Sequence, residues 1–437
     1  MKFPRPAKAA VCALAATALV AGCSSSSSTG AASSTAAANQ KVTLTFWSWV
    51  PNMSKIVAVW NQSHPNIQIK FTEAAGGDAE LSKLLTAGKA GDMPDIAQIE
   101  YQSLPTMVTN NYLADISSYD TKLKTDFPAG LWNQVTLGES ALYGVPQDAA
   151  PLAFFYRTDI FKKYNLAVPT TWAQYAQEAV QLHKDDPSIY MGDTVTTDAG
   201  LFSGLSQQAG AQWWSTSGTS WSVGINSAAS QKVASYWGNL VQEGALDSQT
   251  AWTASWDKSF SSGEYASWIS AVWAPGDLAS QAANTSGDWA MAELPQWTAG
   301  QDVDGAWGGS ATSVTSDSKH TQQAAEFIAW LNDSTQGTNL LVQDGSIYPA
   351  SLSAESSSSL PASSFMNQSD FYTLAKQFSA STAAATWGPD VNVAYSDFGD
   401  DFASTVKTEA GYLAALDKLQ NSVIADMKSA NFTISGS

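Results

Sequence analysis

Hydrophobic and polar positions alternate in three short runs near the start of the folded part of the chain. The runs cover residues 42–46, 67–71 and 95–99, and their period of two is typical of β-strands with one buried face. Apolar residues at helical spacing separate these runs, first over 53–60 and then over 81–85. This alternation of strands and helices predicts a parallel sheet with helices packed on its faces.

Helical signals dominate the rest of the chain. Residues 171–174, with the sequence Thr-Trp-Ala-Gln, form a capping box and predict that a helix begins there. Further helices are expected around residues 233–241, 324–331 and 413–427, and the run 268–272 has the character of a strand. No period of about 20 to 50 residues recurs, which argues against a repeat protein.

The composition is that of a globular protein. The chain has 437 residues, of which 44% are apolar and 14% are charged, so it has enough hydrophobic material for large cores. At roughly 100 to 200 residues per domain, this length predicts two or more domains. Lys and Arg number 21 against 39 Asp and Glu. This balance argues against a nucleic-acid partner, because a polyanion is bound by clustered basic side chains.

Residues 1–22 have the pattern of a secretory signal peptide. Lys2, Arg5 and Lys8 precede an apolar stretch of 14 residues, which is shorter than the roughly 20 residues of a membrane-spanning helix. The stretch ends in Val-Ala-Gly followed by Cys23, which resembles the lipobox of bacterial lipoproteins. The resemblance implies that Cys23 carries a lipid after cleavage. The alternative is an ordinary cleavage site with an incidental cysteine.

Residues 23–40 are rich in Ser, Ala, Thr and Gly and contain no large apolar side chain. Such a segment does not bury enough surface to offset the entropy lost on ordering it. It is therefore expected to be a lipidated, flexible tether. Cleavage would remove Cys12 and three basic residues, so the mature chain would have a charge of 18 − 39 = −21.

Several short segments follow one another in the order seen in a known family. They are 46–49 (Phe-Trp-Ser-Trp), 64–67 (His-Pro-Asn-Ile), 91–96 (Gly-Asp-Met-Pro-Asp-Ile), 143–146 (Tyr-Gly-Val-Pro), 155–161 (Phe-Tyr-Arg-Thr-Asp-Ile-Phe), 168–172 (Val-Pro-Thr-Thr-Trp), 294–295 (Leu-Pro), 307–310 (Trp-Gly-Gly-Ser) and 348–349 (Tyr-Pro). Together they make the chain resemble the family 1 extracellular solute-binding proteins of ABC transporters, the group that includes maltose-binding protein. The resemblance covers nearly all of the chain after the tether.

The resemblance implies a periplasmic-binding-protein-like α/β fold, in which a hinge that the chain crosses several times joins two α/β lobes around a ligand cleft. Lobe one is expected to hold residues 41–148 and 303–347, and lobe two residues 150–300 and 350–437. The implied function is that of a lipoprotein on the outer face of the cell membrane. It would bind a carbohydrate, an oligosaccharide by preference, and deliver it to the permease of an ABC importer with a separate ATPase. A monomer without a cofactor is expected.

A sugar site needs aromatic faces for the C–H surface of the ring and carboxylates or amides for its hydroxyls. Neutral sugars also suit a protein of this acidity. In open α/β sheets, ligands bind beyond the carboxyl ends of the strands. Six residues that follow strand-like runs are therefore candidates: Trp47, Trp49, Glu100, Tyr101, Gln147 and Asp148.

Seven more candidates lie later in the chain. Trp273 follows the strand-like run at 268–272, and the family resemblance implies a stacking aromatic at its position. Trp307 precedes Gly308 and Gly309, which allow the backbone to approach a ligand closely. The weaker candidates are Tyr348, Trp387 and Asp390.

Tryptophan is also a frequent core residue, and the chain contains 18 of them. Four have the spacing of buried helix faces and are assigned to packing: Trp60, Trp172, Trp237 and Trp330. Five others, in a polar part of lobe two, fit either role: Trp213, Trp214, Trp221, Trp252 and Trp256.

The sequence has no pattern typical of catalysis or metal binding. The three histidines are isolated, and neither a Gly-x-Ser-x-Gly motif nor a phosphate-binding loop is present. The chain is therefore interpreted as a binding protein without enzymatic activity. The alternatives are a secreted glycoside hydrolase, which needs two carboxylates at a fixed separation, and a surface adhesin that holds polysaccharide.

Overall fold

The computed structural model describes residues 41–119, 122–194, 196–355, 365–366, 368–403 and 406–435. The expected signal peptide, Cys23 and the tether lie outside the described residues. Within these ranges, no helix combines the length and the apolar character needed to cross a lipid bilayer.

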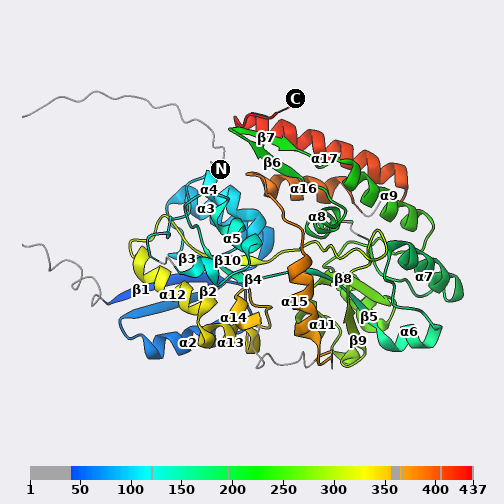
Figure 1. The fold of residues 1–437 in the computed structure, drawn as a ribbon, viewed down its shortest axis with the longest axis horizontal. Coiled ribbons are helices and arrows are strands. Elements are labelled where there is room, and N and C mark those ends of the chain that lie inside the picture. Colours follow the sequence, from blue (N-terminus) through cyan, green and yellow to red (C-terminus); the bar gives the residue numbers. More distant parts are fainter. Residues whose placement is uncertain are drawn as a thin grey trace, which may run out of the picture.

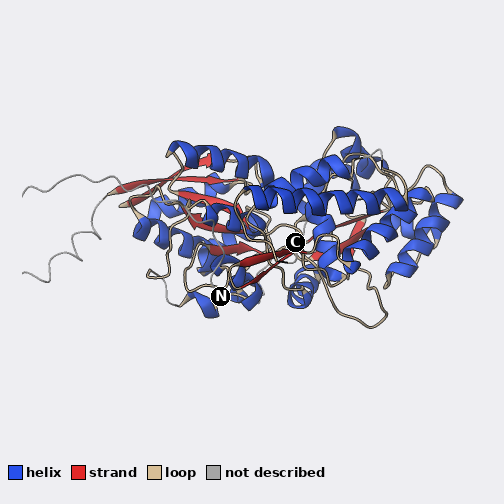
Figure 2. Ribbon diagram, turned by 90° about the horizontal axis from the view of Figure 1, so that it is seen from above, coloured by secondary structure: helices blue, strands red, loops and turns tan. Residues whose placement is uncertain are grey.

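Two α/β lobes lie side by side in the structure (Figure 1). Figure 2 shows the strands running through the middle of each lobe, with helices on both sides. We call the lobe that contains the first sheet lobe one and the lobe that contains the second sheet lobe two. This arrangement matches the fold class expected from the sequence.

The sheet of lobe one has the strand order β2-β1-β3-β10-β4. Its strands are β1 Val42–Ser48, β2 Ile67–Glu73, β3 Ile96–Glu100, β4 Val145–Asp148 and β10 Ser310–Val314. The expected parallel pairing is confirmed for β1 with β2 and for β1 with β3. It is wrong for β10, which lies antiparallel between β3 and β4. The sheet is therefore mixed.

Helices lie on both faces of this sheet, and the first strand is more deeply buried on one face than on the other. Val42, Leu44 and Phe46 are buried on one face, where the Phe46 ring meets Phe327 edge to face at 5.5 Å. On the opposite face, Lys83 lies over the ring of Trp47. The helices of this lobe are α2 Met53–Ser63, α3 Gly77–Ala90, α4 Leu104–Thr109, α5 Ala129–Thr136, α12 Thr321–Asp333 and α13 Thr335–Gln343, with the 3₁₀ turns η1 Tyr101–Ser103 and η2 Leu123–Thr125. The short α14 Leu352–Glu355, which follows the third crossing between the lobes, packs on α13.

The sheet of lobe two is antiparallel, with the strand order β8-β5-β9. Its strands are β5 Leu152–Arg157, β8 Ser267–Ala271 and β9 Trp289–Ala292, and a separate hairpin consists of β6 Trp214–Ser217 and β7 Ser220–Val223. The helices are α6 Thr158–Tyr164, α7 Trp172–Asp185, α8 Ala199–Gln208, α9 Ala228–Gln242, α10 Ala254–Ser262, α11 Ala274–Gln281, η3 Ala283–Thr285, α15 Phe371–Ser381, α16 Val391–Asp401 and α17 Glu409–Ser429. The long helix α17 packs along α9 and α16 (Figure 1).

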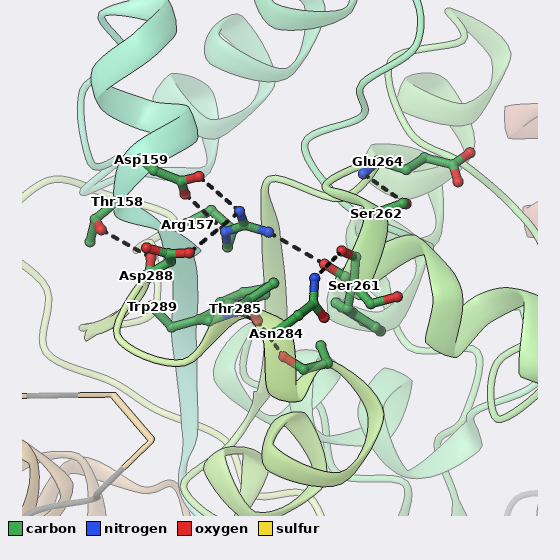
Figure 3. Close-up of polar contacts among 12 residues, drawn as sticks. Arg157, Thr158, Asp159, Ser261, Ser262, Glu264, Asn284, Thr285, Asp288 and Trp289 are labelled. Carbon is green, nitrogen blue, oxygen red and sulfur yellow. Dashed lines mark hydrogen bonds and ion pairs between the residues drawn. The ribbon is translucent and has the colours of Figure 1, made fainter.

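A buried arginine ties three elements of lobe two together (Figure 3). Arg157, the last residue of β5, donates Nε–H and Nη2–H to the two carboxylate oxygens of Asp159, at 2.9 and 2.8 Å. Its other contacts reach the Phe260 carbonyl oxygen at the end of α10 and the Asp288 carboxylate before β9. Because a buried guanidinium needs such partners, we interpret this network as an anchor of the fold.

Three segments of the chain pass between the lobes, and they lie next to one another. The first follows β4, the second leads into β10 and the third follows α13. Isolated β-bridges join Asp148 to Pro349 and Pro151 to Ala306. Adjacent crossings of this kind allow the lobes to rotate relative to each other while the sheets stay intact.

Candidate functional site

Four carboxylates from separate elements influence one another electrostatically where the lobes face each other. Glu100 ends β3, Asp148 ends β4 and Asp78 lies in the first turn of α3, so these three belong to lobe one. Asp198 belongs to lobe two, where its side chain caps the amino end of α8 by accepting a hydrogen bond from the Leu201 N–H at 3.0 Å. We call these four residues the carboxylate cluster.

The carboxylate cluster is electrostatically unfavourable when all its members are ionised. Burial raises the pKa of Glu100 to about 8, and repulsion from Asp78, Asp148 and Asp198 adds to the rise. Burial also raises the pKa of Asp148 to about 6, although hydrogen bonds from Ser310 oppose this effect. The repulsion connects residues of both lobes, so the cluster lies between them.

Burial also raises the pKa of Asp198 to about 6. Hydrogen bonds from Leu201 and Trp252 lower this pKa, whereas repulsion from Asp78 raises it further. Asp78 itself is solvent-exposed, yet the protein atoms around its carboxyl raise its pKa as well. Among the described residues, no lysine or arginine pairs with Glu100, Asp148 or Asp198. The cluster therefore offers hydrogen-bond acceptors that suit hydroxyl groups and disfavour anions.

Five tryptophans of lobe two and its connection to lobe one pack beside the cluster. Trp273 and Trp307, both sequence candidates, meet at 4.8 Å between ring centroids, and the Trp273 Nε1–H donates to the Trp307 carbonyl oxygen at 3.1 Å. Trp268 and Trp256 lie beneath them and are buried. Trp252 lies on the outside and contacts the other four. We call these five residues the tryptophan cluster.

Two glycines bring the loop before β10 close to the carboxylates. Gly308 and Gly309 have φ angles of 85° and 80°, a conformation that residues with a side chain rarely adopt. A Cβ atom at Gly309 would lie 2.9 Å from the ring of Tyr101 and 3.3 Å from the Asp148 carbonyl oxygen. The Tyr101 hydroxyl donates to that same oxygen at 3.0 Å. The backbone at Gly309 therefore lies close to Tyr101 and to the last residue of β4.

The other sequence candidates lie in different surroundings. Trp47 lies under α3, with Lys83 Nζ 3.9 Å from its ring centroid. Trp49 packs against Gly76 at the start of α3. Gln147 is buried within the sheet, where its side-chain oxygen accepts a hydrogen bond from the Thr312 hydroxyl at 3.1 Å.

Tyr348, Trp387 and Asp390 are all buried. Tyr348 stacks on Tyr372 at 6.3 Å, and Trp387 lies 6.4 Å from Trp214. Asp390 precedes α16, and burial together with the nearby carboxylate of Asp426 raises its pKa to about 8. None of these contacts joins the three residues to the carboxylate cluster.

Four residues of this site were not predicted as candidates: Asp78, Asp198, Trp252 and Tyr395. The Tyr395 hydroxyl of α16 lies 3.3 Å from the Ser203 hydroxyl of α8, and Glu100 is among the negative charges that raise its pKa. The sequence signal for Trp252 was its position in a tryptophan-rich, polar segment, which did not distinguish binding from packing. The other three residues follow no strand, so the strand-end rule did not select them.

A cavity of about 530 Å³ adjoins the site. It lies between α5 of lobe one and the segment 379–387 of lobe two, and it shares Tyr101 and Gly308 with the surroundings of the carboxylate cluster. The Gln134 side chain reaches across to donate a hydrogen bond to the Ala385 carbonyl oxygen at 3.1 Å. None of the described residues that line this cavity is charged. Its lining does include the amide side chains of Asn133, Gln134 and Gln207 and the rings of Tyr101 and Trp387, so the cavity also offers groups that suit a neutral sugar.

The described residues contain no group of three or more His, Cys, Asp or Glu side chains arranged to hold a metal ion.

Comparisons with known proteins give a consistent result. Residues 37–337 match the model of a family described as bacterial extracellular solute-binding proteins. The chain is 25% identical over 342 residues to an arabinooligosaccharide-binding protein of Bacillus subtilis (strain 168), covering 74% of this chain and 75% of the relative. It is 25% identical over 309 residues to a lactose-binding protein of Rhizobium radiobacter, covering 65% and 69%.

A solved structure of similar fold is the galacto-N-biose/lacto-N-biose I-binding protein of an ABC transporter from Bifidobacterium longum, in complex with lacto-N-biose. The TM-score is 0.80 at 26% identity, and the alignment covers 90% of this chain and 99% of that protein.

Proposed function

Because the chain belongs to the family of bacterial extracellular solute-binding proteins, we propose that it captures a neutral oligosaccharide between its lobes and delivers it to an ABC importer. The family is extracellular, so the protein acts outside the cytoplasm. The importer would consist of permease subunits and a separate ATPase.

One observation carries this proposal: within the described part of the chain, carboxylates of both lobes repel one another beside partly exposed tryptophans and have no basic partner. Sugar hydroxyls would donate hydrogen bonds to Glu100, Asp148 and Asp198, and the C–H face of a sugar ring would stack on the ring of Trp273 or Trp307. A ligand that bonds to both lobes favours their closed arrangement, because it gains contacts there that the open form does not provide. The names of the three relatives, which refer to sugars, support the same ligand class.

The boundaries of the lobes and the mode of attachment are part of the proposal. Lobe one would comprise residues 41–148 and 303–347, and lobe two residues 150–300 and 350–437. A lipid on Cys23 would hold the protein at the membrane, where the tether lets the folded part reach the permease. The protein would act as a monomer, since both halves of the cleft come from one chain.

A thermal-shift and calorimetric screen tests this function directly. The panel comprises lactose, lacto-N-biose, arabinotriose and maltotriose, with a digalacturonate as the anionic control. A sugar that binds only the folded state adds RT ln(1 + [L]/Kd) to the free energy of unfolding, about 2.7 kcal/mol at a hundredfold excess over Kd. We expect at least one neutral sugar to stabilise the protein and the digalacturonate to have no effect.

Chromatography of the sugar after incubation separates binding from hydrolysis. Recovery of unchanged oligosaccharide supports a binding protein, whereas release of shorter sugars would support a glycoside hydrolase. A protein that binds only long polysaccharide and no member of the panel would fit an adhesin and contradict the proposal.

A further inference from the structure

Trp252 is the most exposed of the large hydrophobic side chains that the described part of the chain presents to solvent, at 48% relative exposure. Its ring nevertheless contacts four other tryptophans, with centroid distances of 5.1 Å to Trp256, 6.0 Å to Trp307, 6.2 Å to Trp268 and 6.3 Å to Trp273. Trp256 and Trp268 are buried at 2% and 5%. Trp252 therefore forms the outer surface of the tryptophan cluster and has half of its own surface free.

The backbone of Trp252 is unusual for a residue of this size. Its φ angle is 62°, in the left-handed region that bulky residues seldom occupy and that glycine adopts freely. Packing alone does not account for a tryptophan here, because half of the side chain is in solvent. Residues that hold such a conformation are concentrated at binding sites, where the surrounding structure maintains them.

The orientation of the ring is fixed by the carboxylate cluster. The Trp252 Nε1–H donates to Asp198 Oδ2 at 3.1 Å, while Asp198 Oδ1 accepts the Leu201 N–H at 3.0 Å. A carboxylate has about four lone-pair positions, so Asp198 keeps the capacity to accept a further hydrogen bond. Asp198 is also one of the charges that repel Glu100 across the cleft. The indole thus has a defined position at the boundary between the lobes.

We propose that Trp252 is a ligand-stacking residue, which holds one sugar ring of the oligosaccharide on its exposed face while Asp198 accepts a hydroxyl of the same ring. This inference rests on the proposed sugar-binding function and adds a specific subsite to it. The ligand unit must present both an apolar C–H face and an adjacent hydroxyl. An anionic sugar unit would be repelled by Asp198 and Glu100.

The test uses a variant that removes the ring and relieves the backbone at once. Trp252→Gly places glycine at a φ angle that glycine adopts freely, which offsets part of the stability lost with the contacts of the ring to the four other tryptophans. Its affinity for the best-bound neutral sugar of the panel should fall about ten- to a hundredfold, because an aromatic platform is lost. Trp252→Phe retains an aromatic face without the N–H donor, and its sugar affinity should fall by less than about tenfold.

The control is Trp297→Ala in the same lobe. Trp297 is half-buried and packs on Trp172 and Tyr236 at 5.9 and 5.4 Å, with Lys232 over its ring. This variant should lose more stability in urea unfolding than Trp252→Gly and should keep the affinity of the unchanged protein. Calorimetric titration and urea unfolding of all variants measure both quantities.

Two results overturn the inference, and they are distinguishable. If the unchanged protein binds a sugar and Trp252→Gly binds it equally well, the stacking role is wrong and the proposed function stands. If the unchanged protein binds no member of the panel, the proposed function fails and this inference fails with it. A fall in the sugar affinity of Trp252→Gly without a matching loss of folding stability supports both the stacking role and the proposed function.

Discussion

Replacing Glu100 by Gln tests whether burial and repulsion from neighbouring carboxylates raise the pKa of Glu100 in the protein without sugar. The pKa of Glu100 is raised to about 8 by burial and by repulsion from Asp78, Asp148 and Asp198. The folded protein therefore holds a proton that the unfolded chain releases near the ordinary pKa of 4.5. Stability from this source is fully present below about pH 4.5 and is lost as the pH rises through about 8.

The size of the effect follows from the difference between the two pKa values. Each pKa unit corresponds to about 1.4 kcal/mol, so a change from 4.5 to about 8 corresponds to about 5 kcal/mol at most. Glu100 keeps some contact with solvent, and rotation about the hinge would separate Asp198 from it. We therefore expect Glu100→Gln to raise the free energy of unfolding at pH 8.5 by about 1 to 3 kcal/mol. Glu100→Gln retains an oxygen that can accept the hydrogen bond from the Gln102 side chain, so the polar contact is preserved.

Urea unfolding at pH 5 and at pH 8.5, without sugar, measures this difference. Glu100→Gln should be more stable than the unchanged protein at pH 8.5 and nearly equal to it at pH 5. The control is Glu326→Gln, which alters an exposed glutamate on α12 and should leave the pH dependence as it was. If Glu100→Gln keeps the full pH dependence of the unchanged protein, then neither burial nor repulsion from the other carboxylates raises the pKa of Glu100 in solution, and the electrostatics described for the carboxylate cluster are wrong.

Three further predictions address attachment, the site and closure. Cys23→Ala should move the protein from the membrane fraction to the soluble fraction without changing sugar affinity, and persistence on the membrane after a salt wash would contradict the lipid anchor. Trp273→Ala should weaken sugar binding about ten- to a thousandfold in calorimetric titration, and Trp273→Phe much less. Unchanged affinity in a destabilised Trp273→Ala protein would remove that residue from the site. The radius of gyration from small-angle scattering should fall when a neutral sugar saturates the protein, and a constant value would contradict closure.

Local signals in the sequence predicted the elements that depend on hydrophobic periodicity. The alternating runs at 42–46 and 67–71 became β1 and β2, because their apolar side chains face helices of lobe one. The capping signal at Thr171 is confirmed, since its side chain accepts a hydrogen bond from the Gln174 N–H at 3.2 Å. Trp60, Trp172 and Trp237, assigned to packing, are buried at 2% or less.

Strand β10 shows where prediction from hydrophobic periodicity fails. Its sequence, Ser-Ala-Thr-Ser-Val, has no hydrophobic alternation, yet every residue is buried. The Gln98 amide donates to the Ser310 hydroxyl at 2.9 Å, and the Thr312 hydroxyl donates to Gln147 at 3.1 Å. Polar side chains are tolerated there because neighbouring strands supply hydrogen-bond partners. Those partners are far away in the sequence, so the pattern of one segment does not predict them.

Some residues of the candidate site could be predicted from local sequence, and others could be recognised only in the folded structure. The rule that ligands bind beyond strand ends selected Glu100 and Asp148, and both belong to the carboxylate cluster. Asp198 and Tyr395 come from helices, and only the packing of lobe two against lobe one brings them to Glu100. For Trp252, exposure and the φ angle distinguish a binding role from a core role, and both depend on the folded structure.

The carboxylate cluster also connects ligand binding to the movement of the lobes. Asp78, Glu100 and Asp148 belong to lobe one and Asp198 to lobe two, so their mutual repulsion opposes closure when they are ionised. Sugar hydroxyls that donate to these oxygens would stabilise the ionised carboxylates and would be bound best when both lobes contribute. Under the proposed function, a neutral sugar would therefore favour closure of the lobes in two ways, by adding contacts and by offsetting the repulsion, whereas an anionic sugar would add to the repulsion. The same charges that destabilise the closed protein without ligand would thus make closure depend on a ligand with hydroxyl donors.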